Sequence, residues 1–269
     1  DILDQTSTIR ELPDAVAVDG ELHGDVIFEH VTFEREGHKI LDDVSFHVAP
    51  GEKIGIIGPI GSGKTTIVAL LTRAYDPSAG RVLVDGVDVR SYKLQDLRRA
   101  IGVVTQDVFL FSDSLEENIN VTDLPVSEKE IREATKQSDI YQNILDFKED
   151  FGTVVGERGV TLSGGEKQRV TIARAFLKKP RILVLDDALS AVDADTEKHI
   201  LDNIGGFQSR PTTLVISNRI SALRQMDRIL VLDAGRIVEE GPHSMLLQKH
   251  GWYWRVFRRQ LVEHKVEKE

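Results

Sequence analysis

One stretch of the sequence combines small, basic and hydroxyl side chains in the spacing of a phosphate-binding loop. The pattern G-x-x-x-x-G-K-[ST] is matched by Gly58, Pro59, Ile60, Gly61, Ser62, Gly63, Lys64 and Thr65. The glycines let backbone N–H groups surround nucleotide phosphates, Lys64 brings charge to the outer phosphates, and the Thr65 hydroxyl is a ligand for Mg²⁺. An apolar run precedes the loop and a helical run begins at Thr66. This context favours a nucleotide site from Gly58 to Thr66 over a glycine-rich turn without a ligand.

Two carboxylates stand at the end of another apolar run. Asp186 and Asp187 directly follow residues 182–185, and ligands of α/β sheets bind at the carboxyl ends of the strands. Taken alone, this pair would be better explained by helix capping. Beside a phosphate loop, we instead expect Asp186 to hold Mg²⁺ through water.

The segment just ahead of these carboxylates resembles the signature of ABC-type ATPases. It reads Leu162-Ser163-Gly164-Gly165-Glu166-Lys167-Gln168-Arg169. Similarly, Gln106 resembles the Q-loop glutamine of that family, and residues 190–193 (Ser-Ala-Val-Asp) resemble its D-loop. Ser163 is suited to cap a helix whose positive N-terminal end faces a γ-phosphate held by a second subunit. The resemblance covers nearly the whole chain from about residue 22.

The resemblance implies the ligands and the residues that contact them. ATP and Mg²⁺ are the expected ligands, and the metal would be held by Thr65, Gln106 and Asp186. The residues expected at the reacting phosphate are Asp187, Gln106 and Asn218. The residues expected to contact nucleotide are Arg35, Gly58 to Thr66, Ser163, Gly164, Gly165 and Gln168.

Two further segments are similar to exporter-type members of the family. Residues 153–159 and Phe109-Leu110-Phe111 resemble the surface that faces the coupling helices of the membrane domain, although ordinary loop residues are the alternative. Residues 1–22 are polar, contain Pro13 and have the character of a connector. The chain does not begin with Met. We therefore expect a fragment: the ATPase domain of an exporter, cut from the membrane domain of the same polypeptide, at the cytoplasmic face of the inner or plasma membrane.

Three positions depart from the family's pattern, and all belong to one nucleotide site. Asp187 stands where active members carry a Glu that polarises the attacking water, so the carboxylate is retracted by one methylene. Asn218 replaces the switch His; its amide can donate a hydrogen bond to the γ-phosphate but cannot carry a proton or a positive charge. Arg35 replaces the aromatic residue that stacks on adenine, although a guanidinium plane can also stack.

The intact signature together with these departures implies a split between two sites. In ABC dimers the signature of one subunit completes the phosphate loop of the other. This chain is therefore expected to pair head to tail with a different ABC ATPase chain, to hydrolyse ATP weakly at its own site and to complete its partner's site. The alternatives are an active homodimer that tolerates Asp187 and a natural or engineered Asn218, and a regulatory module that binds ATP without hydrolysis.

Composition argues against several other classes. The net charge of -10 repels nucleic acid and weighs against a soluble ABC ATPase of DNA repair or translation. The connector weighs against an importer ATPase, since those are usually separate chains. There is no cysteine, and the eight histidines lack metal-ligand spacing. No apolar run approaches the roughly 18 residues of a membrane-spanning helix.

The elements that position these residues follow from the apolar pattern. Short β-branched and aromatic runs between about 24 and 50 predict an antiparallel β-layer. Buried mixed or parallel strands are predicted at 54–57, 182–185, 213–216 and 229–232.

Helices are predicted mainly in the second half of the chain. Capping-box patterns mark helix starts at Ser127 with Glu130 and at Ser163 with Glu166. One face of a final helix is predicted from Trp252, Val256, Phe257 and Leu261.

The predicted fold class is α/β, a phosphate-loop NTPase of ABC type. It combines a mixed-sheet core with an antiparallel β-layer and a helical subdomain. We expect residues 1–22 to be the connector and residues 23–269 the ATPase domain, with the helical subdomain inserted at about 107–178.

Overall fold

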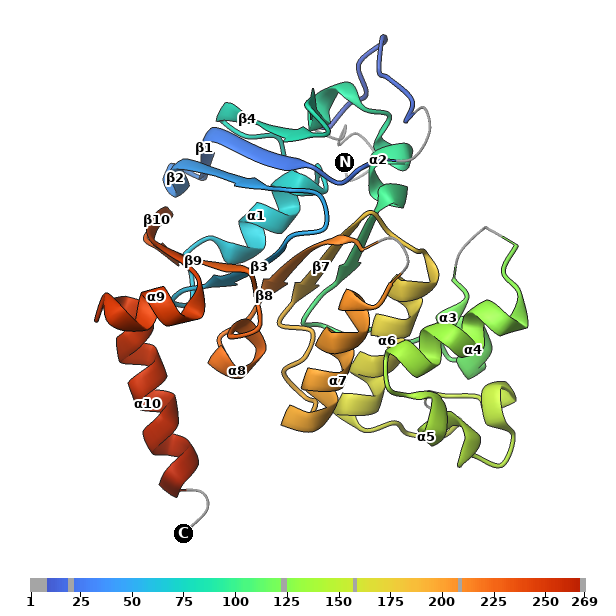
Figure 1. Ribbon diagram of the computed structural model, residues 1–269. Coiled ribbons are helices and arrows are strands. Elements are labelled where there is room, and N and C mark those ends of the chain that lie inside the picture. Colours follow the sequence, from blue (N-terminus) through green and yellow to red (C-terminus); the bar gives the residue numbers. More distant parts are fainter. Residues whose placement is uncertain (1–8, 19–21, 122–124, 157–158, 208–209, 267–269) are drawn as a thin grey trace.

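The computed structural model describes residues 9–18, 22–121, 125–156, 159–207 and 210–266. At its centre is a six-stranded sheet in the order β10-β9-β3-β8-β7-β6 (Figure 1). Its strands are β3 (Lys53–Ile57), β6 (Ile101–Val104), β7 (Ile182–Asp186), β8 (Thr212–Ile216), β9 (Arg228–Asp233) and β10 (Arg236–Gly241). All neighbours pair in parallel except β10, which is antiparallel to β9. Every residue of β7 and β8 is buried, which explains why these strands stand out as nearly continuous apolar runs.

A second, four-stranded antiparallel sheet has the order β2-β1-β4-β5. Its strands are β1 (Val26–Arg35), β2 (His38–Val48), β4 (Ala79–Val84) and β5 (Val87–Asp88). Burial largely alternates along β1, as expected for a sheet with one face on a core and one in solvent. This sheet is the predicted β-layer, and it lies above the central sheet in Figure 1.

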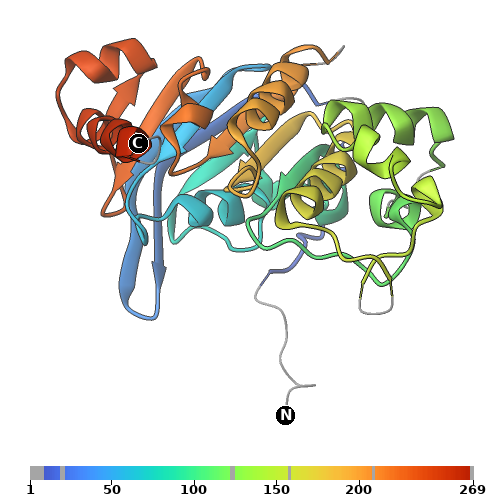
Figure 2. The same cartoon turned by 90° about the horizontal axis from the view of Figure 1, so that it is seen from below.

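The helices lie on both faces of the central sheet. Helix α1 (Lys64–Leu71) lies between the two sheets, and most others cover the opposite face (Figures 1 and 2). The remaining helices are η2 (Val89–Ser91), α2 (Leu94–Ala100), α3 (Leu115–Ile119), α4 (Glu128–Gln137), α5 (Tyr141–Leu145), η3 (Asp150–Gly152), α6 (Gly164–Leu177), α7 (Ala194–Gly205), α8 (Ile220–Leu223), α9 (His243–Gln248) and α10 (Trp252–Val266). Within the described ranges, no helix has the length and apolar character needed to cross a membrane.

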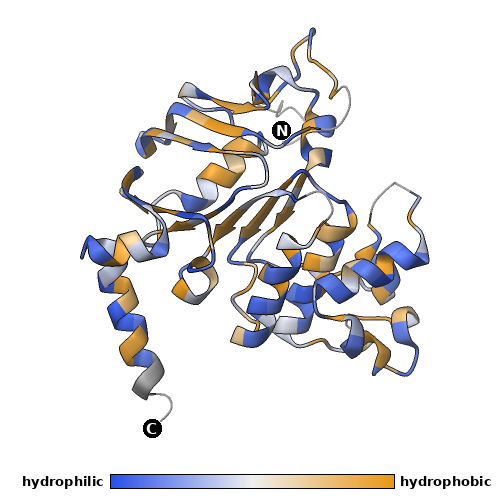
Figure 3. Ribbon diagram, in the orientation of Figure 1, coloured by the Kyte–Doolittle hydropathy of each residue, from blue (hydrophilic) through white to orange (hydrophobic). Residues whose placement is uncertain are grey.

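Two hydrophobic cores divide the interior. One joins the four-stranded sheet, α1 and one face of the central sheet, with Phe28, Ile56 and Leu70 among its buried residues. The other joins the opposite face of that sheet to α3–α10, with Leu185 and Phe176 among its members. Colouring by hydropathy shows the strands between these cores as a continuous apolar layer (Figure 3). The central sheet is therefore buried on both faces and gives a rigid base for the loops at its edge.

The predicted helix starts are confirmed by hydrogen bonds. Ser127 and Ser163 both form capping boxes, in which the serine hydroxyl accepts from the third helical N–H and the glutamate accepts from the serine N–H. The predicted final helix is also present, but Leu261 is 44% exposed and the fully buried residue on α10 is Tyr253. A glutamine, Gln260, lies directly before Leu261 and makes the polar contacts described below.

Residues 9–18 of the expected connector run along α2. Val16 N donates to Ser91 O at 2.7 Å, and Lys93 N donates to Val16 O at 2.9 Å. The Glu11 carboxylate accepts from Leu94 N, the first residue of α2, at 2.7 Å. This part of the segment is therefore attached to the domain by regular backbone pairing.

A buried asparagine shapes the loop that holds the two exposed aromatic residues Phe109 and Phe111. The Asn118 side chain accepts from Phe111 N at 2.8 Å and donates to the carbonyl oxygens of Phe111 and Ser114 at 3.0 and 2.9 Å. Asn118 is fully buried on α3. The loop conformation thus depends on one side chain that satisfies several backbone groups.

Replacing Asn118 should therefore destabilise the domain. We expect Asn118→Ala to lower the free energy of unfolding by about 2–3 kcal/mol, because buried backbone groups lose their partners. Urea denaturation followed by circular dichroism measures this change, and Gln142→Ala on the exposed face of α5 is the control. A loss below about 1 kcal/mol would contradict this role for Asn118.

Candidate functional site

The parallel strands bring several of the predicted site residues to one edge of the central sheet. Ile56 of β3 and Asp186 of β7 are both in register with Ile216 of β8, and Val104 of β6 is in register with Leu185. Parallel strands in register end at the same edge. The phosphate loop, Asp186 with Asp187, Asn218 and Gln106 therefore leave the sheet side by side.

The phosphate loop has a shape that only glycine allows at two positions. A Cβ on Gly58 would lie 1.9 Å from the carbonyl oxygen of Leu232, so the backbone passes too close to β9 for any side chain. Gly63 has a φ of 102° and directly precedes α1, a conformation that other residues rarely adopt. The loop therefore folds back tightly and leads directly into the N-terminal end of α1, where backbone N–H groups bind anions.

The loop surrounds a buried cation. Lys64 is 8% exposed, and its Nζ donates to the carbonyl oxygens of Gly58 and Pro59 at 2.7 and 2.9 Å. Burial lowers the pKa of Lys64, while the negative charges of Asp187 and Asp186 oppose that shift. Beside it the buried Ser62 hydroxyl has no hydrogen-bond partner in the described part of the chain. An unsatisfied buried donor of this kind fits a ligand with acceptor oxygens.

Asp186 and Thr65 form an oxygen pair next to this loop. Asp186 is buried at the end of β7, and its carboxylate is hydrogen-bonded to the Thr65 side chain. Burial raises the pKa of Asp186, the Thr65 hydrogen bond lowers it, the Asp187 charge raises it, and the Lys64 charge lowers it. Across the described ranges, no group of three or more His, Cys, Asp or Glu side chains could hold a metal. One carboxylate with a hydroxyl is the type of site at which Mg²⁺ binds together with substrate phosphates.

Three further polar residues follow strand ends at the same edge of the sheet. Asp187 is half-buried, has a φ of 48° and donates its backbone N–H to Ile216 O at 2.9 Å. Asn218 and Gln106 are exposed, each two residues beyond its strand. All three predicted residues thus follow the ends of neighbouring strands at this edge, and Asn218 and Gln106 are accessible to solvent.

The signature segment and the D-loop segment are joined to each other. The Gln168 side chain is buried; it donates to Ser190 Oγ at 3.0 Å and accepts from Ala191 N at 2.9 Å. Gly165 also lies against this segment, since a Cβ there would be 2.8 Å from Ala191 O. Ser163 and Gly164 are exposed. Gln168, predicted to contact nucleotide, is therefore turned inward, whereas the first residues of the signature face solvent.

The sequence analysis missed Arg219, which links the Asn218 loop to the D-loop segment. Its Nη1 donates to Leu189 O and Val192 O, both at 3.1 Å, and its Nη2 lies 3.3 Å from the buried Glu197 carboxylate. Burial raises the pKa of Glu197, and both the Ser221 hydrogen bond and the Arg219 charge oppose this. The one signal in the sequence that could have pointed to Arg219 is its position directly after Asn218.

Tyr75 is a second residue that sequence reasoning missed. The exposed Arg35 donates from Nη1 to Tyr75 Oη at 2.8 Å, and its guanidinium lies 5.2 Å from the Tyr75 ring centroid. The Tyr75 ring in turn contacts Phe33, with centroids 5.4 Å apart. Arg35 is therefore held against an aromatic ring at the end of β1.

The exporter-like segments form one apolar surface. Phe109 and Phe111 are 66% and 51% exposed and pack edge to face, with ring centroids 5.0 Å apart. Val154 is also exposed and bridges to Ser114 in the neighbouring segment. Arg174 of α6 supports this surface by donating to Phe109 O at 3.2 Å and to Asn118 O at 2.8 Å. Glu157 and Arg158 of the predicted segment lie outside the described residues.

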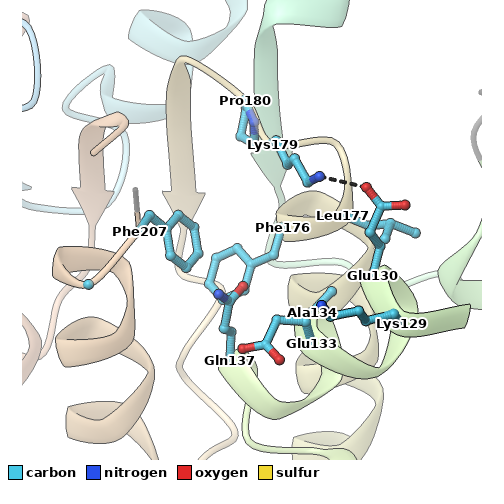
Figure 4. Close-up of a pocket in the computed structure, with 11 residues that line it drawn as sticks. Lys129, Glu130, Glu133, Ala134, Gln137, Phe176, Leu177, Lys179, Pro180 and Phe207 are labelled. Carbon is cyan, nitrogen blue, oxygen red and sulfur yellow. Dashed lines mark hydrogen bonds and ion pairs between the residues drawn. The ribbon is translucent and has the colours of Figure 1, made fainter. Parts of the chain in front are cut away.

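A cavity of 610 Å³ lies away from the sheet edge, between α4, the end of α6 and the end of α7. Figure 4 shows Phe176 and Phe207 on one side and the Lys179–Glu130 ion pair on the other. The hydrogen bond from Lys179, together with the hydrogen bonds from Ser127, lowers the pKa of Glu130 to about 2. No phosphate-loop residue lines this cavity, so it is separate from the site above.

Comparison with known proteins agrees with the geometry. A family model described as ABC transporter matches residues 41–190. The chain is 43% identical over 254 residues to ATP-binding cassette sub-family B member 6 of Xenopus tropicalis, covering 93% of this chain and 30% of that protein. It is 44% identical over 244 residues to the ATP-dependent lipid A-core flippase of Burkholderia pseudomallei (strain 1710b), covering 89% of this chain and 41% of the flippase. The chain thus spans less than half the length of these curated relatives.

A solved structure gives the same result for the fold. The structure of a bacterial Atm1-family ABC exporter with ATP bound matches with a TM-score of 0.91 and 41% identity, over 96% of this chain and 46% of that chain. The predicted fold class is confirmed. The chain belongs to the ABC transporter family, and its α/β architecture is the ABC-type phosphate-loop fold of that exporter.

Proposed function

We propose that this chain binds ATP with Mg²⁺ at the sheet edge that carries the phosphate loop. The observation that carries the proposal is the tight glycine loop around the buried Lys64, beside the Ser62 hydroxyl, which has no hydrogen-bond partner among the described residues. Loop and α1 backbone N–H groups would bind the phosphates, and Lys64 would exchange its bonds to Gly58 O and Pro59 O for the outer phosphates.

The oxygen groups at the same edge suit Mg²⁺. Thr65 and Asp186 would hold it, with Gln106 reaching toward it from the neighbouring strand end. Bound there, Mg²⁺ would neutralise negative charge on the phosphates as the reaction proceeds. Burial lowers the pKa of Lys64 and raises that of Asp186, and the opposite charge of each residue counteracts part of this shift in the other.

We further propose that hydrolysis at this site is weak. Asp187 is the group at the sheet edge that can act on an attacking water, but its carboxylate is one methylene shorter than a glutamate. Asn218 can donate a hydrogen bond to the γ-phosphate but adds no positive charge. Since phosphoryl transfer depends on positioning and charge stabilisation, losing both groups should cost ~100-fold or more in rate.

A head-to-tail dimer would use the exposed signature. Ser163 and Gly164 face solvent at the N-terminal end of α6, and none of the hydrogen bonds or ion pairs found between described residues joins them to the phosphate loop of the same chain. They are therefore free to complete the site of a second subunit, and ATP between the two would hold the dimer closed. We propose that this partner is a different ABC ATPase chain that hydrolyses ATP at the completed site.

Export through an attached membrane domain is the proposed role of the dimer. The similar proteins are named as a flippase and an exporter, and each extends well beyond the matched part. The exposed surface of Phe109, Phe111 and Val154 would contact that domain on the cytoplasmic side of the membrane. Dimer closure on ATP binding and reopening after hydrolysis would move the membrane domain between its conformations.

Binding of ATP should depend on Lys64. We expect Lys64→Ala to raise the Kd for Mg-ATP by ~100-fold, as charge-assisted hydrogen bonds to phosphate are lost. Isothermal titration calorimetry measures the Kd, and Lys148→Ala, an exposed lysine remote from the loop in sequence, should leave it unchanged. An unchanged Kd in Lys64→Ala would reject the assigned pocket.

Restoring the two altered positions should restore turnover. We expect the parent chain to bind Mg-ATP but hydrolyse it very slowly, and Asp187→Glu with Asn218→His to raise kcat by ~100-fold. Steady-state phosphate release at high protein concentration, which favours dimers, measures the rate. Adding Lys64→Ala to the double variant should remove the gain.

Robust turnover by the parent chain would contradict the proposal of a weak site. An active homodimer would then explain the data better. No turnover by the double variant, with ATP binding retained, would support a module that binds ATP without hydrolysis.

A further inference from the structure

The C-terminal helix reaches the Asn218 loop through one side chain. Gln260 of α10 donates from Nε2 to Asn218 O at 2.7 Å, and its Oε1 accepts from Ile220 N at 3.0 Å. These two groups flank Arg219, so a single amide holds the backbone on both sides of that residue. Asn218 itself keeps an exposed side chain.

Gln260 adds to the support that the Arg219 side chain gives this loop, and it acts on the backbone at the start of α8. Helix α8 is four residues long, and its N-cap Arg219 makes no side-chain cap. The first N–H groups of a helix have no partner within the helix. Gln260 therefore supplies, from a distant part of the chain, the acceptor that a local capping residue would otherwise provide.

The base of α10 is rigid enough to hold this amide in place. Tyr253 is fully buried, and its Oη lies 2.8 Å from His243 Nδ1 of α9. Val256 is buried as well and Phe257 packs on the same core. Residues 253, 256, 257 and 260 lie on one face of a helix. Gln260 is thus the polar residue at the end of the helix face that packs α10 against the domain.

A groove of 530 Å³ lies between α8 and α10, lined by Arg219, Arg224, Phe257, Gln260 and Leu261 among others. In Figure 1, α10 extends away from the body of the domain toward the C-terminus. The two hydrogen bonds of Gln260 therefore connect α10 directly to the Asn218 loop.

We propose that Gln260 is a positioning residue for the nucleotide site. By holding the backbone of Asn218 and Ile220, it places the Asn218 amide toward the γ-phosphate, and through the intervening Arg219 it also fixes the D-loop segment. This inference rests on the proposed function, because it assumes that ATP binds at the phosphate loop.

Hydrogen–deuterium exchange of the 269-residue chain with and without Mg-ATP tests the proposal. Two segments are compared: residues 58–66, which report ATP binding, and residues 217–221, which report the loop. The variants are Gln260→Ala, which removes both bonds, and Gln260→Glu, which can accept from Ile220 N but cannot donate to Asn218 O. Arg259→Ala is the control, since Arg259 is the adjacent residue on α10 and its side chain is 70% exposed.

In the parent chain and in Arg259→Ala, we expect Mg-ATP to slow exchange in both segments. In Gln260→Ala, residues 58–66 should still be protected, while exchange at 217–221 should be ~10-fold faster and no longer respond to ATP. Gln260→Glu should keep the slow exchange of Ile220 N–H but lose the response of the loop to ATP. In the Asp187→Glu, Asn218→His background, Gln260→Ala should lower kcat by ~10-fold with KM changed less than about twofold.

Three results would overturn the inference, and they are distinguishable. Equal protection of residues 217–221 in the parent chain and in Gln260→Ala would mean that the two Gln260 hydrogen bonds do not position the loop. Loss of protection in both segments of Gln260→Ala would mean that Gln260 supports the whole pocket instead. Absence of protection at 58–66 in the parent chain would reject the proposed ATP site itself, and the inference would fall with it.

Discussion

The structure depends on one constraint: parallel strands in register must end at the same edge of the sheet. Because β3, β8, β7 and β6 are neighbours, the loops that follow them meet there, although they come from positions between 58 and 218 of the chain. The sheet is buried on both faces, so this edge is where polar backbone and side chains can gather around a ligand. The buried charge of Lys64 is tolerated at this edge because carbonyl oxygens and the carboxylates of Asp186 and Asp187 surround it.

Polar side chains from distant elements hold the loops at that edge. Gln168 binds the D-loop segment from α6, Arg219 binds it from the Asn218 loop, and Gln260 binds the Asn218 loop from α10. Short connections without regular structure leave backbone groups unpaired, and buried ones need partners. The resulting chain of hydrogen bonds runs from the signature helix to the C-terminal helix, so a displacement at one loop would disturb the others.

Asp187, Asn218 and Arg35, the three residues that depart from the family's pattern, are accommodated in this fold without visible distortion. Asp187 occupies a left-handed conformation, which Asp and Asn adopt more readily than most residues. Asn218 projects its side chain to solvent while its carbonyl oxygen is bound to Gln260. Arg35 finds an aromatic partner in Tyr75 of the same chain. All three residues are therefore accommodated in a fold that matches an exporter with a TM-score of 0.91.

The sequence by itself determined the fold class, the phosphate loop and the two capping boxes, because each depends on local patterns: periodicity, glycine spacing, or a serine three residues before a glutamate. It also identified the residues that line the sheet edge, since strand ends and their polar followers can be recognised locally. Only the tertiary structure decided which of these side chains are exposed at the edge and which hold the loops. Gln168 turned out to be buried against Ser190, and Tyr75 and Gln260 were found as partners 40 and 42 residues away from Arg35 and Asn218. Such contacts join elements whose separation in sequence carries no periodic signal, so they arise only once the sheets and helices have packed.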